Sequence, residues 1–317
     1  MIGLESIAFS EKGPRVSRMG MGCWAVGGHG WGKIDDAESI AAIRHAFDRG
    51  VTFFDTADTY GLGKSETMLR EALGKGLRSV LVASKGGVRW DESGRVWNDA
   101  SPEYLEQAID ASLRRLGLER IPLYYIHKLD GKTPIPEIIG CLSRLGKRGK
   151  IGEIGVSHFS VAQLEEALSI APIRAVQVRL NLLERESGDE WTSMCKTHDI
   201  KLVTWGALAD GLLTGKFQAE TSFGVDDHRS RLPDFQGERF IENLRRIEAL
   251  KPIARERGVS LSHLALRWIM DKYPWTCPLF GAKTAAQVEE NLGADGWHLT
   301  QEEIDAIERV CGVSTVV

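Results

Sequence analysis

The chain has no long apolar run and no excess of positive charge. No stretch approaches the roughly 20 apolar residues that a membrane span requires, and Met1–Glu5 lacks the basic start and apolar core of a signal peptide. With 40 basic and 44 acidic residues, the net charge of −4 gives no long-range attraction to nucleic acid or to an acidic membrane. We therefore expect a soluble, cytoplasmic protein that binds neither nucleic acid nor membranes.

Paired cysteines and metal-ligand spacings are also missing. The five cysteines are scattered, and nothing beside them supplies a base or a helix start that would activate a thiolate. We interpret them as reduced, buried thiols. Histidines outside the motifs discussed below share no spacing, so the sequence indicates no metal site; they are His29, His45, His198, His228, His263 and His298.

What the chain does have is a regular alternation of short apolar runs and amphipathic stretches, which is typical of parallel βαβ units. The expected strands are Met19–Cys23, Thr52–Asp55, Val80–Ala83, Leu123–His127, Ile151–Val156, Ala175–Val178, Lys201–Trp205 and Cys277–Phe280. The expected helices are Asp36–Arg49, Ser65–Leu73, Pro102–Leu116, Ile135–Arg148, Ser160–Ile170, Asp189–Thr197, Glu238–Arg257, Ser260–Asp271, Thr284–Leu292 and Gln301–Val310.

Several of these helices carry clear end signals. Ser101-Pro102-Glu103 combines a capping serine, a proline at the first helical position and an acid near the positive end of the helix dipole. Ser160 with Gln163, and Thr300 with Glu303, fit capping boxes. Glycines follow the helices at Gly50, Gly117 and Gly258.

Eight strand-helix repeats without a linker predict one domain over residues 1–317, an α/β fold of the (β/α)8 or TIM-barrel type. Ser6–Ser17, with a turn at Lys12-Gly13-Pro14, is expected to form an N-terminal β-hairpin that closes the bottom of the barrel, and extra helices follow at the C-terminus. An open doubly wound sheet is the alternative. The long polar segment Phe217–Gly237 is a candidate lid.

The glycine-rich start contains two nucleotide-binding patterns in unsuitable contexts. Gly20–Ala25 fits G-x-G-x-x-A, but the glycines that follow oppose the helix this fingerprint requires. Gly27–Ile34 fits a P-loop except that Ile34 replaces the Mg²⁺-binding serine or threonine. We interpret Trp24–Lys33 as a loop that carries aromatic residues over a pocket; a purely structural glycine loop is equally compatible with these residues.

Chemically active side chains follow the second, third and fourth strands. Asp55 ends the second strand and Tyr60 lies five residues later, while Lys85 and His127 end the next two strands. The carboxyl ends of barrel strands share one face, so we expect these four to converge. A buried ammonium lowers the pKa of a neighbouring phenol, and a carboxylate keeps that ammonium charged. Taken singly, the residues fit an ion pair, a surface tyrosine and a core histidine; together they suit polarising and protonating a carbonyl group.

These residues, with Phe53–Gly61, Ser84-Lys85, Gly155-Val156-Ser157, Gly211–Lys216 and Gly281-Ala282-Lys283-Thr284…Glu290-Asn291, resemble the aldo-keto reductase superfamily over essentially the whole chain. The resemblance implies a barrel closed by an N-terminal hairpin, a nicotinamide cofactor extended across the strand ends, and no metal. It also implies that Tyr60 is the general acid and base, that Asp55 and Lys85 tune it, and that His127 orients the carbonyl.

The resemblance further assigns the cofactor contacts. Ser157 and Gln177 match residues that hold the carboxamide, Trp205 the aromatic that stacks on nicotinamide, and Lys283 a partner of a 2′-phosphate, which favours NADP(H) while NAD(H) remains an alternative. The full expected set is Gly22, Trp24, Asp55, Ser157, His158, Gln177, Trp205, Gly206, Ala207, Leu208, Gly211, Leu213, Lys216, Gly281, Lys283, Thr284, Gln287, Glu290 and Asn291.

Three residues depart from the family pattern. His158 stands where asparagine is usual, so one carboxamide contact depends on the imidazole tautomer. Asp210 lies in the stretch that faces the pyrophosphate and would repel it unless it turned away. Gln287 occupies a position that is arginine in many relatives, which leaves Lys283 as the main charge for a 2′-phosphate.

The sequence therefore predicts an oxidoreductase that acts on CH-OH groups and reversibly reduces an aldehyde or ketone with NADPH, with Tyr60 as the proton donor. Expected substrate contacts are Trp24, Trp31, Tyr60, Trp90 and His127, which suit aromatic aldehydes and sugars alike. A nucleotide-sensing regulatory or binding subunit with little turnover is the alternative, and a metal-dependent barrel hydrolase is a third hypothesis. We expect a monomer or weak homo-oligomer whose partner is a small carbonyl compound.

Overall fold

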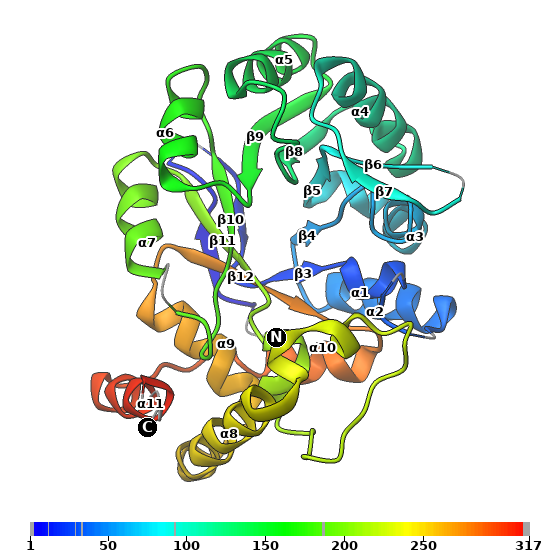
Figure 1. Ribbon diagram of the computed structural model, residues 1–317. Helices are drawn as coiled ribbons and strands as arrows, with labels where there is room; N and C mark the ends of the chain where they lie inside the picture. The colour runs from blue at the N-terminus through cyan, green and yellow to red at the C-terminus, as the bar shows by residue number, and fades with distance from the viewer. Residues whose placement is uncertain are drawn as a thin grey trace.

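The computed structural model describes residues 3–11, 13–28, 30–32, 34–91, 93–185 and 188–312. Its centre is a closed parallel barrel in the order β3-β4-β5-β8-β9-β10-β11-β12, in which β12 pairs with β3 (Figure 1). The strands are β3 (Gly20–Gly22), β4 (Phe53–Asp55), β5 (Leu81–Gly86), β8 (Ile121–Ile126), β9 (Ile151–Ser157), β10 (Ala175–Arg179), β11 (Lys201–Trp205) and β12 (Thr276–Gly281). The predicted barrel is confirmed, and its closure excludes the open sheet.

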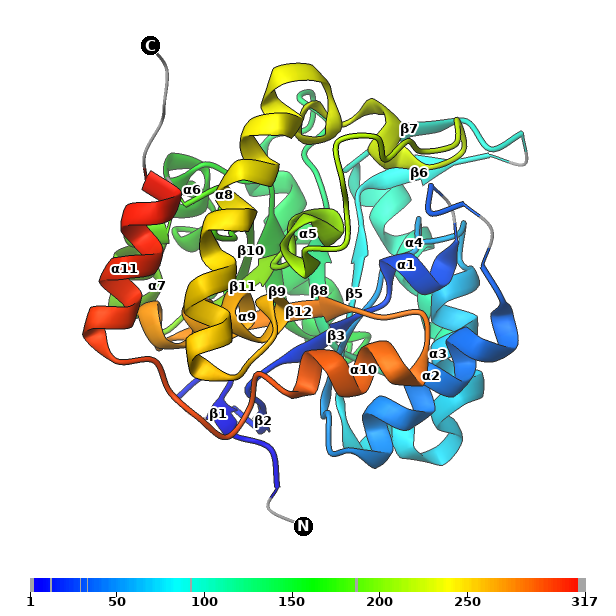
Figure 2. The same cartoon turned by 90° about the horizontal axis from the view of Figure 1, so that it is seen from below.

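The predicted N-terminal hairpin is present and closes one end of the barrel. Strand β1 (Ser6–Ala8) pairs antiparallel with β2 (Arg15–Ser17), beside the N-terminus in Figure 2. Ile7, Phe9 and Val16 of this segment share a buried cluster with residues that point into the barrel, and the Phe9 ring lies 5.5 Å from that of Phe53. The hairpin thus covers apolar side chains that water would otherwise reach. Lys12, in the predicted turn, lies outside the described residues.

Helices surround the barrel and pack their apolar faces on the outer sides of the strands, which leaves the strand ends free for chemistry. They are α2 (Asp36–Asp48), α3 (Lys64–Leu73), α4 (Pro102–Leu116), α5 (Ile135–Lys147), α6 (Val161–Leu168), α7 (Gly188–Thr197), α8 (Gly237–Arg257), α9 (Leu261–Lys272), α10 (Ala285–Leu292) and α11 (Gln301–Gly312).

The predicted end signals are confirmed where the structure tests them. The Ser101 hydroxyl accepts from the backbone of Tyr104, and Ser160 with Gln163 forms a reciprocal capping box. At α11, the backbone of Glu303 donates to the Thr300 hydroxyl, and the Thr300 backbone donates to the Glu303 carboxylate. Gly117 and Gly258 end α4 and α8 in the left-handed conformation, with φ of 66° and 71°.

Two short elements differ from the expected loops. Trp24–Gly27 forms a single helical turn, α1, which Gly28 ends with φ of 85°, so the loop expected over Trp24–Lys33 is wrong at its start. Strands β6 (Val88–Trp90) and β7 (Val96–Asn98) form a hairpin that was not predicted. Of the expected loop, His29 and Lys33 lie outside the described residues.

Short 3-10 turns complete the architecture: η1 (Gly74–Ser79), η2 (Ala209–Thr214), η3 (His228–Arg231) and η4 (Pro233–Phe235). Turns η3 and η4 lie within the candidate lid. All five cysteines are free and buried, as expected. In the described part of the chain, no helix combines the length and apolar character needed to cross a membrane.

Candidate active site

The structure brings Asp55, Lys85 and Tyr60 into direct contact. Asp55 is the last residue of β4, Lys85 lies near the end of β5, and Tyr60 follows in the turn after β4. The Lys85 ammonium nitrogen lies 2.5 Å from Asp55 Oδ1, 2.9 Å from the carbonyl oxygen of Thr56 and 3.1 Å from the Tyr60 hydroxyl. Asp55 and Lys85 are 2% and 1% exposed, so the ion pair is shielded from water.

His127 lies beside the Tyr60 ring. It follows β8, and its ring is nearly perpendicular to that of Tyr60, with the centroids 5.8 Å apart. Burial, reinforced by the charge of Lys85, holds the pKa of His127 well below its usual value, so the imidazole is neutral near pH 7. Its Nδ1 is buried and has no hydrogen-bond partner among the described residues. The ring therefore has hydrogen-bonding capacity to offer a ligand.

The protonation of Tyr60 differs from the expectation. Burial raises the pKa of Tyr60 by more than the neighbouring Lys85 ammonium lowers it, and the net pKa lies above the ordinary value for tyrosine. The expected net lowering is thus wrong, because it weighed the ammonium and left out desolvation. Near neutral pH the Tyr60 phenol is protonated. The Lys85 ammonium lies within hydrogen-bond distance of its oxygen and would stabilise the phenolate after deprotonation.

A cavity of about 500 Å³ extends from Tyr60 along the carboxyl ends of β3, β11 and β12. Its lining includes these expected cofactor residues: Gly22, Trp24, Asp55, Trp205, Gly206, Ala207, Leu208, Gly211, Lys216, Gly281, Lys283, Gln287, Glu290 and Asn291. Of the expected substrate residues, Trp24, Trp31 and Tyr60 line it, whereas His127 and Trp90 stand outside the lining. Most of the expected cofactor residues therefore line one cavity at the carboxyl ends of the barrel strands.

The remaining expected cofactor residues lie outside this lining. Ser157 and Gln177 are buried at β9 and β10, and His158 follows Ser157 with φ of 56° and its ring 5.4 Å from that of Trp205. Leu213 packs into the hydrophobic core, and the Thr284 hydroxyl accepts from the backbone of Gln287 at the start of α10.

The acid that was expected to repel a pyrophosphate, Asp210, is paired with basic side chains in the structure. The Asp210 carboxylate accepts from Arg179 Nη1 at 2.9 Å and contacts His228 Nε2 at 3.3 Å. These partners hold the pKa of Asp210 below its usual value despite burial. Lys216, Lys283 and Arg229 add positive charge to the lining. Asp210 faces the cavity but is paired, so it opposes a bound phosphate less than an unpaired carboxylate would.

The candidate lid reaches over to the loop that follows β3. Asp227 forms a β-bridge with Trp31, and the His228 backbone and Nδ1 both contact the carbonyl oxygen of Gly30, at 2.8 and 2.7 Å. The His228 ring lies 4.7 Å from Trp24 and 4.4 Å from Trp31. In Figure 2 the lid (yellow-green) lies at the end of the molecule opposite to β1 and β2.

Comparison with known proteins now decides the family. Residues 18–311 match the family model described as Aldo/keto reductase family. The chain belongs to the aldo/keto reductase family. It is 37% identical to aldo-keto reductase YhdN of Bacillus subtilis, over 95% of this chain and 91% of that protein, and 32% identical to aldo-keto reductase yakc [NADP(+)] of Schizosaccharomyces pombe, over 95% and 90%.

Solved structures agree with this assignment of an oxidoreductase family. The glycerol dehydrogenase AKR11B4 from Gluconobacter oxydans superposes with a TM-score of 0.89 and 36% identity, over 96% of this chain and 94% of that one. Aldo-keto reductase AKR11C1 from Bacillus halodurans, in its holo form, gives a TM-score of 0.80 and 25% identity, over 97% and 96%.

Sequence reasoning missed some residues of this aldo/keto reductase's cavity, most notably Arg229. Arg229 lies in the lid, is paired with Asp227, and stacks 5.4 Å from the Trp31 ring. The polar lid was a visible signal, but only the fold shows that this arginine faces the cavity. Ser262 and Phe280 also line it and carried no motif signal, whereas Thr214, another lining residue, lies within the Gly211–Lys216 motif.

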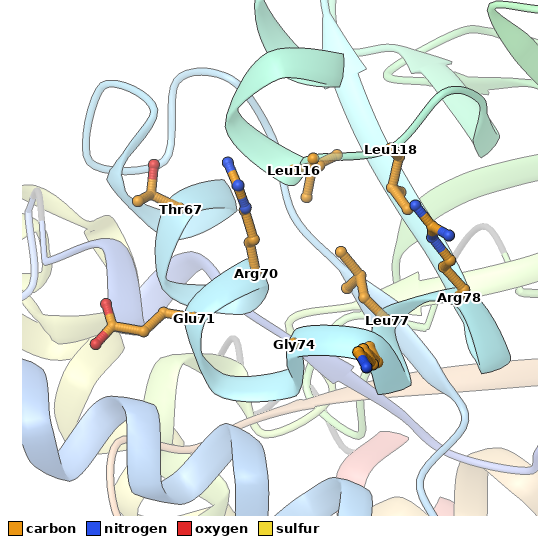
Figure 3. A pocket seen from close by; sticks show the side chains of 10 residues that line it. Thr67, Arg70, Glu71, Gly74, Leu77, Arg78, Leu116 and Leu118 are labelled. Atoms are coloured by element: carbon orange, nitrogen blue, oxygen red, sulfur yellow. The ribbon is translucent and has the colours of Figure 1, made fainter.

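A second cavity, of about 580 Å³, lies on the outside of the barrel between α3, η1 and the end of α4 (Figure 3). Arg70, Glu71, Leu77 and Arg78 line it, and no member of the tetrad, which is Asp55, Tyr60, Lys85 and His127, does. Across the described ranges, no group of three or more His, Cys, Asp or Glu side chains could hold a metal ion. The cavity lined by Asp55 and Tyr60 is therefore the candidate active site.

Proposed function

We propose that the chain is an NADPH-dependent oxidoreductase that reduces an aldehyde or ketone to an alcohol and catalyses the reverse oxidation. The single observation that carries this proposal is the Asp55–Lys85–Tyr60 chain of hydrogen bonds at one end of the cavity, with a neutral His127 beside Tyr60. Such a set donates a proton to a carbonyl oxygen and stabilises the charge that develops there.

The cavity fits a dinucleotide. The partly buried Trp205 lines the cavity with its indole ring, and the cations Lys216, Arg229 and Lys283 supply charge for phosphate groups. A Cβ added at Gly281 would meet no atom within 4 Å, so the backbone there is open to a ligand. When bound, the nicotinamide supplies or accepts the hydride. We assign the expected cofactor residues to this role on these grounds.

Each member of the tetrad has a distinct task. Tyr60, protonated near pH 7 because its pKa is raised, donates its O–H proton to the carbonyl oxygen. Lys85 then stabilises the phenolate, and Asp55 keeps Lys85 charged. His127 donates a hydrogen bond to the same oxygen and fixes its position. In the oxidation, the Tyr60 phenolate accepts the proton of the alcohol.

The preference for NADPH rests on Lys283. Its ammonium lies 2.9 Å from the carbonyl oxygen of Trp31, a weak neutral partner that a dianionic 2′-phosphate can replace. The yeast relative is named with NADP(+), which agrees with this choice. Gln287, at the position where many relatives have arginine, lines the same end of the cavity.

The substrate class is a small carbonyl compound. Trp24 lies beside Tyr60 and meets Trp31 edge to face, with the ring centroids 5.1 Å apart, so that two indole rings limit the space for a substrate. The Gluconobacter relative is a glycerol dehydrogenase, so hydroxyl-bearing aldehydes and ketones are the first to test. Aromatic aldehydes are the second class, because the indole rings can stack on them.

The test measures NADPH oxidation with glyceraldehyde, dihydroxyacetone, methylglyoxal and nitrobenzaldehyde, beside a fluorescence titration with NADPH and NADH. Turnover that depends on Tyr60 supports the proposal. Saturable binding of NADPH without turnover on any substrate would favour a nucleotide-sensing subunit instead, and binding of neither nucleotide would contradict the cofactor assignment.

A further inference from the structure

Gln177 contacts the catalytic ion pair from across the barrel. It lies on β10, 122 residues beyond Asp55 in the chain, and its side-chain amide donates a hydrogen bond to Asp55 Oδ2. Its position is fixed by pairing with Ser157 of β9 and Val203 of β11. Both Gln177 and Asp55 are 2% exposed, so water does not compete for this hydrogen bond.

The contact completes the hydrogen bonding of the carboxylate. Lys85 occupies Oδ1 and Gln177 occupies Oδ2, so both oxygens of Asp55 have donors. A buried carboxylate that loses a donor pays a desolvation penalty, which favours its neutral form. The amide of Gln177 uses its nitrogen for Asp55, which leaves its oxygen, an acceptor, for the amino group of a nicotinamide carboxamide.

We propose that Gln177 is a positioning residue for the reaction: by holding Asp55 as a carboxylate, it keeps Lys85 charged beside Tyr60 and so links the carboxamide site to the proton donor. This inference rests on the proposed function. It adds to the cofactor contact of Gln177 a second role, which acts through Asp55 and Lys85.

The direction of the effect follows from the groups that face Asp55. They are Lys85 on β5, Tyr60 after β4, Tyr125 on β8, Cys23 after β3 and Cys277 on β12. Burial raises the pKa of Cys277 to about 12 and also raises the pKa values of Cys23 and Tyr125, so these three stay neutral. Of the described groups that face Asp55, Lys85 and Tyr60 are therefore the ones that can change charge together with it.

Loss of the Gln177 hydrogen bond to Asp55 changes the pKa of Tyr60 through Lys85. Asp55 raises the pKa of Lys85, and charged Lys85 lowers the pKa of Tyr60. Without the Gln177 donor, Asp55 is a weaker anion, Lys85 is held less firmly in its charged form, and the Tyr60 phenolate loses stabilisation. Removing the amide therefore raises the pKa of Tyr60.

The experiment compares Gln177→Met with Ser157→Ala. Both remove an expected carboxamide contact, but no hydrogen bond joins Ser157 to Asp55 in the described part of the chain. Tyrosine labelled with ¹³C at Cζ reports the ionisation of Tyr60 in the protein without cofactor, and Tyr60→Phe identifies its signal among the five tyrosines. Gln177→Leu replaces Gln177→Met if the latter does not fold.

We expect the Tyr60 titration to move upward by about one pH unit in Gln177→Met and to stay in place in Ser157→Ala. The rising limb of the pH profile of alcohol oxidation should move in the same way. In an Asp55→Asn background, Gln177→Met should add no further shift, because the group through which it acts is gone.

Any of three results would overturn the positioning role. The Tyr60 titration could stay in place in Gln177→Met, or it could shift equally in Ser157→Ala. The full shift could also persist when Gln177→Met is made in the Asp55→Asn background. The titration requires neither cofactor nor turnover. Failure of the proposed function would appear separately, as absence of NADPH oxidation or as turnover that survives Tyr60→Phe.

Discussion

Replacing Lys85 by methionine isolates the contribution of the buried ion pair. The side chains of Lys85 and Asp55 are 1% and 3% exposed and lie 2.5 Å apart, so Lys85→Met leaves a carboxylate with no counter-ion in a dry site. Removing one partner of such a pair destabilises a protein by about 3–5 kcal/mol. Lys64, paired with Asp36 at 2.6 Å on the surface, is a matched control whose methionine variant should lose less than about 1 kcal/mol.

The loss of unfolding free energy in Lys85→Met should depend on pH. Burial raises the folded-state pKa of Asp55 above its value in the unfolded chain, and removing the ammonium raises it further. A neutral Asp55 is tolerated, so the deficit is smallest at acidic pH. Relative to the unmodified protein, the deficit grows by about 1.4 kcal/mol for each pH unit between the folded-state pKa of Asp55 in that protein and its higher folded-state pKa in the variant, and it levels off above the latter.

Urea unfolding at about pH 5 and about pH 8 measures this difference. We expect a larger deficit for Lys85→Met at the higher pH and a small, pH-independent deficit for Lys64→Met. A double variant, Asp55→Asn with Lys85→Met, should recover part of the stability while remaining inactive. The reasoning would be refuted if Lys85→Met unfolded at the same urea concentration as the unmodified protein at both pH values.

Two further predictions concern the cofactor and the scaffold. Lys283→Met should raise the Kd for NADPH by about 10-fold or more and leave the Kd for NADH nearly unchanged, because it removes a charge that only a 2′-phosphate uses. Fluorescence titration measures both Kd values. Equal losses of affinity for NADPH and NADH would contradict the assignment of Lys283. Ser160→Ala should reduce the free energy of unfolding by about 1 kcal/mol, since it removes the capping box of α6. Urea denaturation measures this change. An unchanged midpoint would show that the cap does not contribute to stability.

The barrel and the tetrad could be read from the sequence because each depends on local signals combined with one topological rule. Apolar runs mark the strands of the barrel, and the end of each parallel strand marks the face where Asp55, Lys85 and His127 meet. The β6–β7 hairpin escaped prediction because its side chains, such as Val96 at 46% exposure, lie largely in solvent and so leave no apolar run in the sequence.

Other features depend on tertiary contacts that no local pattern encodes. The Asp55–Gln177 hydrogen bond crosses the barrel between strands that are not neighbours, and Arg229 reaches the cavity only because the lid folds back on Trp31. The raised pKa of Tyr60 likewise depends on how deeply the phenol is buried, which the presence of a nearby lysine does not reveal.

The central claim is that Tyr60 donates the proton, and Tyr60→Phe tests it most directly. The variant removes one hydroxyl group, and it keeps the ring that packs against Trp24 and His127. We predict that NADPH binding, followed by fluorescence, is retained, while kcat for carbonyl reduction falls by about 100-fold or more. An unchanged kcat with intact NADPH binding would contradict the account, because another group would then supply the proton.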